Sequence, residues 1–213
     1  MQEQITSDER ARLAALREYD ILDTVAEEAF DDLVLLAANI CEVPIAFIGF
    51  VDAKREWLKS KAGLNISEIP RYITFCTRTI LGNDVCVVSD TLVQEEYATN
   101  PLVVGEPHIR FYAAAPLVTP DGYSIGAICV IDHVARELSG EQMEALRILA
   151  RQVMAQLELR KKENVLRFNH DELERGVAER TAELLGINLL LRTITVEVTR
   201  QNLALLKHPR NCS

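Results

Sequence analysis

Two apolar runs within residues 111–132 lie on either side of the sequence Thr119-Pro120-Asp121-Gly122. Proline fixes φ early in a turn, aspartate can hydrogen-bond its own backbone, and glycine accepts positive φ. The pattern therefore predicts a β-hairpin. Both arms contain small residues, among them Ala114 and Gly126, which is typical of buried strands that other elements approach closely. We expect this hairpin to form the middle of an antiparallel sheet, with helices on one face and a pocket-forming loop segment on the other.

Three further segments have the residue pattern of strands. The run 45–51 is apolar and predicts a central strand. In 56–62, Lys59 and Lys61 alternate with other residues, so we expect an outer strand with one solvent-exposed face. Residues 85–90 predict another short strand.

Two helices are expected before the first strand. One begins at Ser7 and ends near Tyr19, and the second is capped by Thr24 or a neighbour and ends before Pro44. The shorter connecting segments predict a polar loop over 63–72, a short helix over 75–80, and a loop with at most two helical turns over 91–107.

From residue 141 onward the pattern is that of one long helix. Ser139 followed by Gln142 at the third helical position is typical of a capping box. Leu146, Val153 and Leu157 recur at spacings of three and four, and the helix is long enough to outrun the domain on which it packs. We therefore predict a homodimer with these three residues at its interface, and the sequence leaves parallel and antiparallel pairing of the helices open. The alternative is a helix folded back on its own domain.

Composition and charge narrow the classes of partner. The chain has 213 residues and a net charge of −9, which argues against nucleic acid as the main partner. The most apolar late window, 184–206, is interrupted by Arg192, Glu197 and Arg200, so no membrane span is expected. This window is apolar almost all round, so it needs burial against another chain or its own domain.

Cysteine usage bears on the compartment. The charged start of the chain lacks the apolar core of a secretory leader. The cysteines are irregularly spaced, which predicts reduced thiols in a cytoplasmic protein. They are Cys41, Cys76, Cys86, Cys129 and Cys212. Neither they nor the isolated histidines show metal-ligand spacing, so no metal site is expected.

Six segments, in order, carry a resemblance to a known family: 17–30, 43–60, 70–80, 88–91, 100–103 and 109–132. Together they resemble the GAF sensor domain found ahead of bacterial histidine kinases and diguanylate cyclases. The resemblance implies an α+β fold with a central antiparallel sheet of five or six strands, flanking helices and a long C-terminal helix. It covers the domain 1–160, and residues 161–213 then form a helical tail that resembles a coiled-coil connector.

The resemblance also implies where a small molecule would bind, between the sheet and the segments around the second strand and the hairpin. By position the candidate ligand-pocket residues are Trp57, Arg71, Phe75, Cys76, Asp90, Phe111 and Tyr112. Aromatic side chains with a few polar groups are typical of such sites. The alternative is that these aromatic residues fill the core of a domain that binds nothing.

Related domains use cysteines in two kinds of chemistry, and the cysteines of this sequence match neither pattern well. Related photoreceptors attach a bilin to a cysteine usually followed by histidine, whereas Cys76 is followed by Thr77. Some GAF proteins reduce free methionine sulfoxide, and Cys76 and Cys86 resemble part of their arrangement. That enzyme also needs a cysteine before the hairpin, and residues 87–128 contain none. No catalytic residue is therefore predicted, and any cofactor is left unknown.

The function expected from the sequence is cytoplasmic signal sensing in a two-component or related system. Ligand-dependent repacking around Trp57, Phe75 and Phe111 would bias the paired tail helices. The sequence contains no kinase or cyclase signature, so output would lie on a histidine kinase or other partner, or the chain is a shortened sensor. A dimerisation scaffold and a thiol enzyme acting on methionine sulfoxide are the alternatives.

Overall fold

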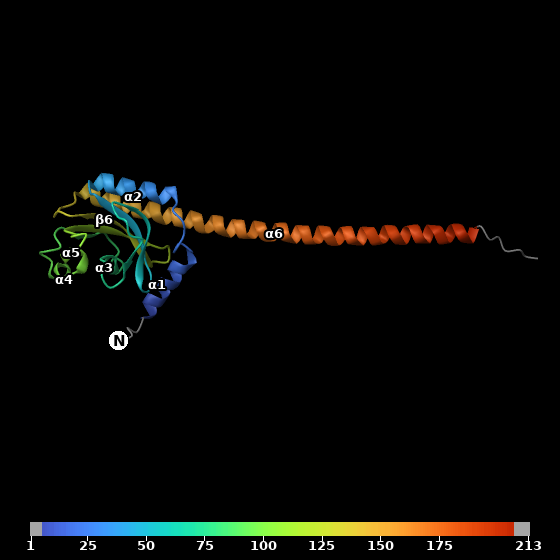
Figure 1. Cartoon of the computed structure of the whole chain (residues 1–213), viewed down its shortest axis with the longest axis horizontal. Helices are drawn as coiled ribbons and strands as arrows, with labels where there is room; N and C mark the ends of the chain where they lie inside the picture. The colour runs from blue at the N-terminus through green and yellow to red at the C-terminus, as the bar shows by residue number, and fades with distance from the viewer. Residues whose placement is uncertain (1–5, 207–213) are drawn as a thin grey trace, which may run out of the picture. The chain divides into compact units, whose positions relative to one another are not determined.

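An antiparallel sheet, covered by helices, is the framework of the domain (Figure 1). It has six strands in the order β3-β2-β1-β6-β5-β4. The strands are β1 Ile45–Val51, β2 Arg55–Ala62, β3 Glu68–Pro70, β4 Cys86–Val88, β5 Phe111–Val118 and β6 Ser124–Asp132. The computed structural model describes residues 6–206, so Cys212, His208 and the first five residues lie outside the described part of the chain. The α+β architecture expected from the sequence is confirmed.

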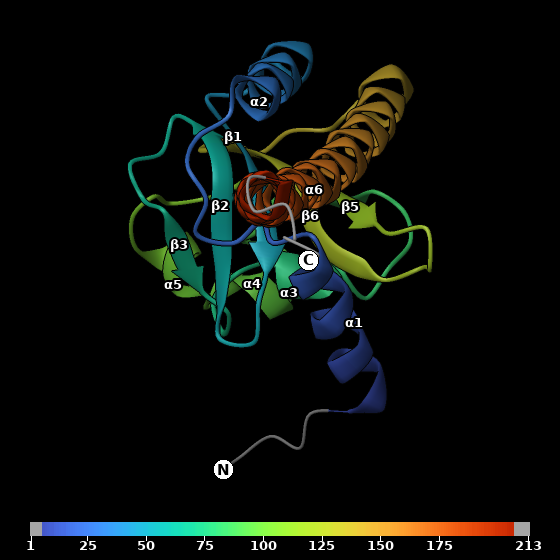
Figure 2. The same ribbon diagram turned by 90° about the vertical axis from the view of Figure 1, so that its right-hand side faces the viewer.

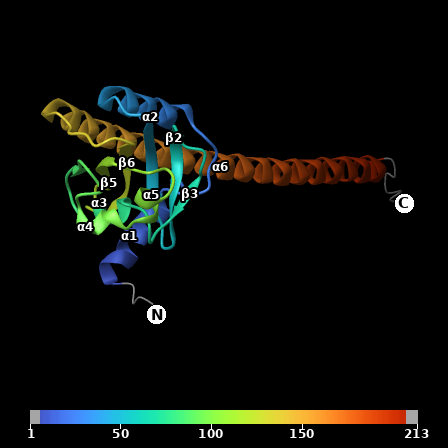
Figure 3. The same cartoon turned by 60° about the vertical axis from the view of Figure 1, so that its left-hand side comes forward.

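Helices occupy both faces of this sheet. They are α1 Ser7–Glu18, α2 Glu28–Cys41, α3 Cys76–Thr79, α4 Glu95–Ala98, α5 Pro101–Val104 and α6 Gly140–Leu206. Figures 2 and 3 show α2 and the first part of α6 over one face, with α3, α4 and α5 on the other side. The two short helices α4 and α5 lie in the segment 91–107, where the sequence predicts at most two helical turns. The chain divides into two compact units between Lys162 and Glu163.

The central hairpin is confirmed in detail. The Gly122 amide donates to the Thr119 carbonyl (2.9 Å), and Gly122 has a φ of 88°, a value that favours glycine. Gly126 on β6 lies against β1, where an added Cβ would meet the Gly49 carbonyl at 2.1 Å. The small residue at this position therefore allows β1 and β6 to pair closely.

The two faces of the sheet carry separate hydrophobic cores. The first core, on the side of α2 and α6, includes Phe30, Phe50 and Phe111. The second core, on the side of α3 to α5, includes Phe47 and Tyr112. Phe111 and Tyr112 are neighbours in β5 and point to opposite faces, as side chains of consecutive strand residues do.

The expectation of a solvent-exposed face on β2 is wrong. Residues 56–60 are all buried, and the side chain of Lys59 is fully buried. Its ammonium group donates to Thr24 Oγ1 (2.9 Å), the Val25 carbonyl (2.6 Å) and Glu27 Oε1 (2.6 Å). Thr24 does not cap α2, because the helix begins at Glu28 and its N-cap is Glu27, which makes no side-chain capping bond. β3 pairs with β2 on its outer side, within the segment expected to be a loop.

The capping box that starts α6 is confirmed by two reciprocal bonds. The Gln142 amide donates to Ser139 Oγ (3.1 Å), and the Ser139 amide donates to Gln142 Oε1 (3.0 Å). Through Gly176 and Gly186 the helix continues without a break. Among the described residues, no helix contains a stretch long and apolar enough to cross a bilayer.

The first turns of α6 pack on the sheet of their own domain. Leu146, Val153 and Leu157 are between 0% and 1% exposed and belong to the first core. These residues are thus covered within one chain and offer no surface to a second copy. The interface predicted for them does not fit this burial, because their apolar periodicity reflects packing on the sheet.

A network of charges holds α1 against the turn after β1. Arg12 donates to both oxygens of Glu9 and to the Val51 carbonyl, and Arg71 donates to Glu9 Oε1 (2.6 Å) and the Asp52 carbonyl. Burial alone would raise the pKa of Glu9, but the hydrogen bonds from the two guanidinium groups outweigh it and lower this pKa to about 2.

We expect truncation of the buried helix face to destabilise the domain. Leu157→Ala should lower the free energy of unfolding by about 2–5 kcal/mol, because it leaves a cavity in the first core. The matched control is Leu159→Ala, since Leu159 is 50% exposed on the same helix, and a change of at most about 0.5 kcal/mol is expected. Urea unfolding measures the free energy of unfolding of both variants. Equal losses would contradict the assignment of Leu157 to the core.

The ion network predicts a pH dependence. The pKa of Glu9 is about 2 in the folded state, below its ordinary value of 4.5, so its ion pairs stabilise the fold above pH 4.5. This contribution is lost as the pH falls towards 2. Glu9→Gln should therefore lower Tm near neutral pH, and its difference from wild type should narrow as the pH falls.

Thermal unfolding across this pH range tests the prediction. Asp8→Asn, which removes an exposed charge on the same helix, serves as the control for net charge. If the difference in Tm between Glu9→Gln and wild type stays constant from neutral to acidic pH, the role given to these ion pairs is contradicted.

Candidate functional site

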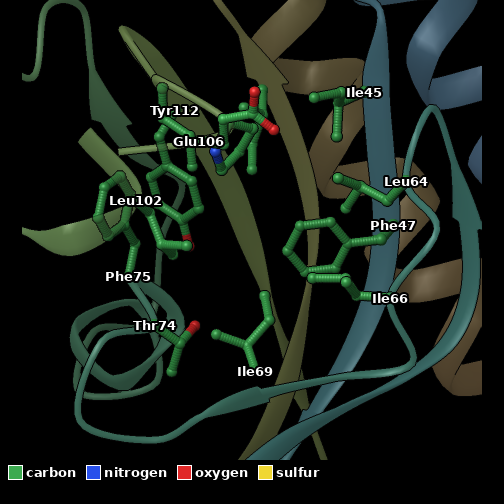
Figure 4. A pocket seen from close by; sticks show the side chains of 13 residues that line it. Ile45, Phe47, Leu64, Ile66, Ile69, Thr74, Phe75, Leu102, Glu106 and Tyr112 are labelled. Atoms are coloured by element: carbon green, nitrogen blue, oxygen red, sulfur yellow. The ribbon is translucent and has the colours of Figure 1, made fainter. Parts of the chain in front are cut away.

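A cavity of about 310 Å³ opens into the second core, on the face of the sheet away from α2. Strands β1, β5 and β6 supply its floor, and β3, α5 and the loops before β3, before α3 and after α5 supply its walls. Its lining residues are Ile45, Phe47, Leu64, Ile66, Ile69, Thr74, Phe75, Leu102, Glu106, Pro107, Ile109, Tyr112 and Ile131. In Figure 4, Phe75, Leu102 and Tyr112 lie along one side and Phe47, Leu64 and Ile66 along the other.

Most of this lining is apolar. Three of its side chains carry polar groups, those of Thr74, Glu106 and Tyr112, and none carries a positive charge. The hydroxyl of Thr74 donates to Glu56, and that of Tyr112 is hydrogen-bonded to Thr79 Oγ1 (2.7 Å). Two of the three polar groups are therefore already paired with protein, and the carboxylate of the exposed Glu106 provides the charge of the cavity.

Aromatic contacts fix the wall that Phe75 forms. Its ring meets Tyr112 edge-on, with centroids 5.1 Å apart and an interplanar angle of 84°. A second contact joins Phe75 to Tyr97, with centroids 4.7 Å apart. Such tilted pairs are the favoured arrangement of aromatic quadrupoles. Phe75 and Tyr112, both predicted as pocket residues, are brought together at the cavity.

The other five predicted pocket residues do not line this cavity. Trp57 packs beside Phe50, and both it and Phe111 belong to the first core, on the opposite face of the sheet. Arg71 joins the ion network around Glu9. Asp90 accepts a hydrogen bond from the Leu92 amide (2.9 Å). Cys76 is fully buried behind the cavity wall.

The sequence reading missed most of the apolar lining, although part of it could have been found. Ile45 and Phe47 alternate with Ala46 and Ile48 in β1, and the pocket side of that strand follows from placing α2 against the other side. Leu64 and Ile66 lie in a loop and Leu102 lies in the four-residue helix α5, and none of the three has a periodicity that would indicate its role.

A cluster of buried polar groups lies behind the cavity wall; we call it the Glu56 cluster. It consists of Glu56, Thr74, Cys76, Tyr112 and Cys129. Cys76 Sγ is 3.1 Å from Cys129 Sγ and 3.2 Å from the Tyr112 hydroxyl. The carboxylate of Glu56 occupies the space that a side chain on Gly49 would need, since an added Cβ there would lie 2.1 Å from Glu56 Oε1.

Burial dominates the electrostatics of this cluster. It raises the pKa of Glu56 to about 6, and the neighbouring Cys76 thiol and the hydrogen bond from Thr74 oppose that rise. Burial also raises the pKa values of Cys76 and Tyr112 well above their ordinary range, and it raises the pKa of Cys129. The thiols are therefore held protonated at neutral pH and are weak nucleophiles as they stand.

Within residues 6–206, three of these side chains form a group that could hold a metal ion. The ligand atoms of Glu56, Cys76 and Cys129 all lie within 4.8 Å of one another. The sequence reading expected no metal site because these positions are widely separated along the chain. Cys76 contacts Cys129. From the sequence, Cys76 and Cys86 were instead compared with the cysteines of the methionine sulfoxide reductases.

Comparison with solved structures supports the fold. A domain of a putative two-component sensor histidine kinase from Sinorhizobium meliloti is 18% identical, with a TM-score of 0.53 and coverage of 68% of this chain and 99% of that chain. The GAF domain of an Acinetobacter phosphoenolpyruvate-protein phosphotransferase is 16% identical, with the same TM-score and coverage of 72% and 94%. At this identity the likeness concerns the fold alone.

Sequence comparison gives one relative and one family match. A cyclic di-GMP phosphodiesterase of Pseudomonas aeruginosa is 38% identical over 151 residues, which are 70% of this chain and 26% of that protein. The chain thus spans about a quarter of the length of this relative. The model of the GAF domain family matches residues 25–157. Because this match covers the sheet, the cavity and the Glu56 cluster, the chain belongs to the GAF domain family.

Proposed function

We propose that this GAF domain is a sensory module that binds a small apolar molecule in the cavity beside Phe75 and Tyr112. The observation that carries the proposal is the lining itself, which is apolar, partly aromatic and open to a ligand. A volume of about 310 Å³ falls at the lower end of the range of roughly 300–1,000 Å³ typical of small-molecule sites.

The charges of the lining restrict the class of ligand. An anion buried here would lose its hydration without gaining a cationic partner, and it would face the carboxylate of Glu106. Phosphate-bearing ligands such as cyclic nucleotides are therefore disfavoured in this cavity. A neutral molecule, or one with a single amine reaching Glu106, fits its chemistry better.

We further propose that the second unit transmits the state of the domain through a homodimer. Within it, apolar side chains recur at spacings of three and four, with one spacing of seven across Arg180, which is typical of a two-stranded coiled coil. We call these residues the tail stripe: Leu173, Val177, Leu184, Ile187, Leu191, Ile194 and Val198. All seven are between 49% and 69% exposed within one chain. A second copy would cover them.

The output of such a sensor would lie outside the domain. The curated relative is named as a cyclic di-GMP phosphodiesterase, and this chain matches about a quarter of its length. By analogy, the tail would pass a change in helix pairing to an output activity, such as a histidine kinase or an enzyme of a cyclic dinucleotide. We expect no methionine sulfoxide turnover, because the buried Cys76 thiol is held protonated.

Ligand binding can be tested at the rim of the cavity. Ile66 lines the cavity and is 44% exposed, so Ile66→Trp should fill the cavity without opening the core. A panel of small neutral molecules and cyclic nucleotides is screened by thermal shift. A neutral ligand present at a hundred times its Kd should stabilise the protein by about 2.7 kcal/mol. Ile66→Trp should weaken that ligand at least tenfold.

The matched control is Leu81→Trp, which adds the same ring at a residue that is 83% exposed and outside the cavity. Native mass spectrometry of protein taken directly from cells provides a second measurement. If no small molecule is retained and none in the panel raises Tm, the ligand proposal is wrong and a scaffold role is favoured.

The dimer proposal has its own test. Replacing both Ile187 and Leu191 with lysine places charges in the tail stripe, and light scattering should then give the monomer mass in place of the dimer mass. Leu189→Lys is the control, because residue 189 lies on the opposite side of the helix from the stripe. A monomeric wild type at working concentration would contradict the proposal.

A further inference from the structure

We propose that Glu56, Cys76 and Cys129 bind a borderline-soft divalent cation, with Zn²⁺ as the type ion, in the Glu56 cluster behind the cavity wall. The proposal concerns these side chains alone and does not rest on the ligand proposed for the cavity.

Three separate elements bring the ligand atoms together. Glu56 comes from β2, Cys76 from the start of α3, and Cys129 from the middle of β6. All three residues are fully buried, and their ligand atoms lie within 4.8 Å of one another. The buried carboxylate is the informative member of this group, because an ionised carboxylate is costly to bury without a partner, whereas a neutral thiol is buried readily.

The carboxylate supplies a second, independent observation. Its Oε2 accepts a hydrogen bond from Thr74, whereas Oε1 is buried and has no hydrogen-bond partner. Gly49 leaves room for this oxygen, which a side chain there would displace. A buried acceptor without a donor is destabilising. A cation bound between Oε1 and the two sulfurs would satisfy it.

The donor set fits zinc chemistry. Zn²⁺ takes thiolate sulfur at about 2.3 Å and carboxylate oxygen at about 2.0–2.2 Å in a tetrahedral site. Two sulfurs bound in this way lie about 3.8 Å apart, so the present 3.1 Å separation of Cys76 and Cys129 would widen slightly. The Tyr112 hydroxyl, 3.2 Å from Cys76 Sγ and 3.9 Å from Cys129 Sγ, is placed to complete the fourth position.

Binding of the cation releases two protons and leaves the site with a small net charge. Each thiol loses its proton to water when its sulfur binds the cation, and Glu56 binds as the carboxylate. The two thiolates, the carboxylate and a divalent cation then carry a single net negative charge. The Thr74 hydroxyl, which donates to Glu56, helps to stabilise that charge and orients the carboxylate.

The same two sulfurs could instead be joined as a disulfide by an oxidant. That reaction would remove the two thiol hydrogens and leave Glu56 Oε1 without a partner. Cation binding accounts for the carboxylate as well as for the thiols, which is why we favour it.

Cobalt substitution tests the site directly. The full chain, kept reduced and stripped with a chelator, is titrated with Co²⁺. We expect one Co²⁺ per chain, with thiolate-to-cobalt charge-transfer absorption and the strong visible bands of a tetrahedral ion, and we expect Zn²⁺ to displace it. Glu56→Gln and Cys129→Ser should each weaken Co²⁺ binding about tenfold or more.

Two variants keep the test decisive. Glu56→Gln retains the shape of the side chain and a group that can accept from Thr74, so it reports on the site even if Cys129→Ser fails to fold. Cys41→Ser is the matched control, because Cys41 is a buried cysteine on α2 in the other core, and its Co²⁺ spectrum should match that of wild type. Circular dichroism checks the fold of each variant.

Three results would overturn the proposal. One is the lack of a thiolate-to-cobalt spectrum in the folded, reduced wild type. Another is undiminished binding in folded Glu56→Gln. The third is protein whose mass is lower by two hydrogens as isolated from cells and which binds no Co²⁺ after reduction, because the sulfurs would then serve as a disulfide pair alone.

Discussion

Consecutive residues of a β-strand point to opposite sides of the sheet, and this alternation determines where every functional group of the domain can lie. The six-stranded sheet separates two cores that share its backbone. Ile48 and Phe50 of β1 pack towards α2 and α6, whereas Ile45 and Phe47 of the same strand face the cavity. Long, uninterrupted helices cover the first core. Short helices and loops cover the second, and the apolar cavity lies among them.

Local chemistry made much of the fold predictable. The turn at 119–122, the reciprocal cap between Ser139 and Gln142, and the alternation of apolar strands with amphipathic helices depend on near neighbours in the sequence. β2 was misread for a reason that is not local. Its lysine pattern indicates an exposed face, but the segment before α2 folds over Lys59 and supplies three acceptors for its ammonium group. A charged residue with such partners can be buried, and sequence periodicity does not report the partners.

The candidate site was predictable only in part, and again for a physical reason. Phe75 and Tyr112 were identified, but Phe111 was grouped with them although adjacent strand residues cannot face one cavity. Glu56, Cys76 and Cys129 were not grouped, because the positions are distant in the chain. The pairing of β1 with β2 and β6 brings Glu56 near Cys129, and the packing of α3 on the sheet adds Cys76. Membership of the GAF family establishes the scaffold. What the scaffold binds depends on side chains that differ at low identity, here an apolar lining without a cation.

Residues 74–76 connect the cavity to the Glu56 cluster within three consecutive positions. Thr74 and Phe75 line the cavity, Thr74 donates to Glu56, and Cys76 touches Cys129. The cavity wall and the buried thiol therefore share one short stretch of backbone, so a guest that shifted the backbone at Phe75 would also act on the packing of Cys76.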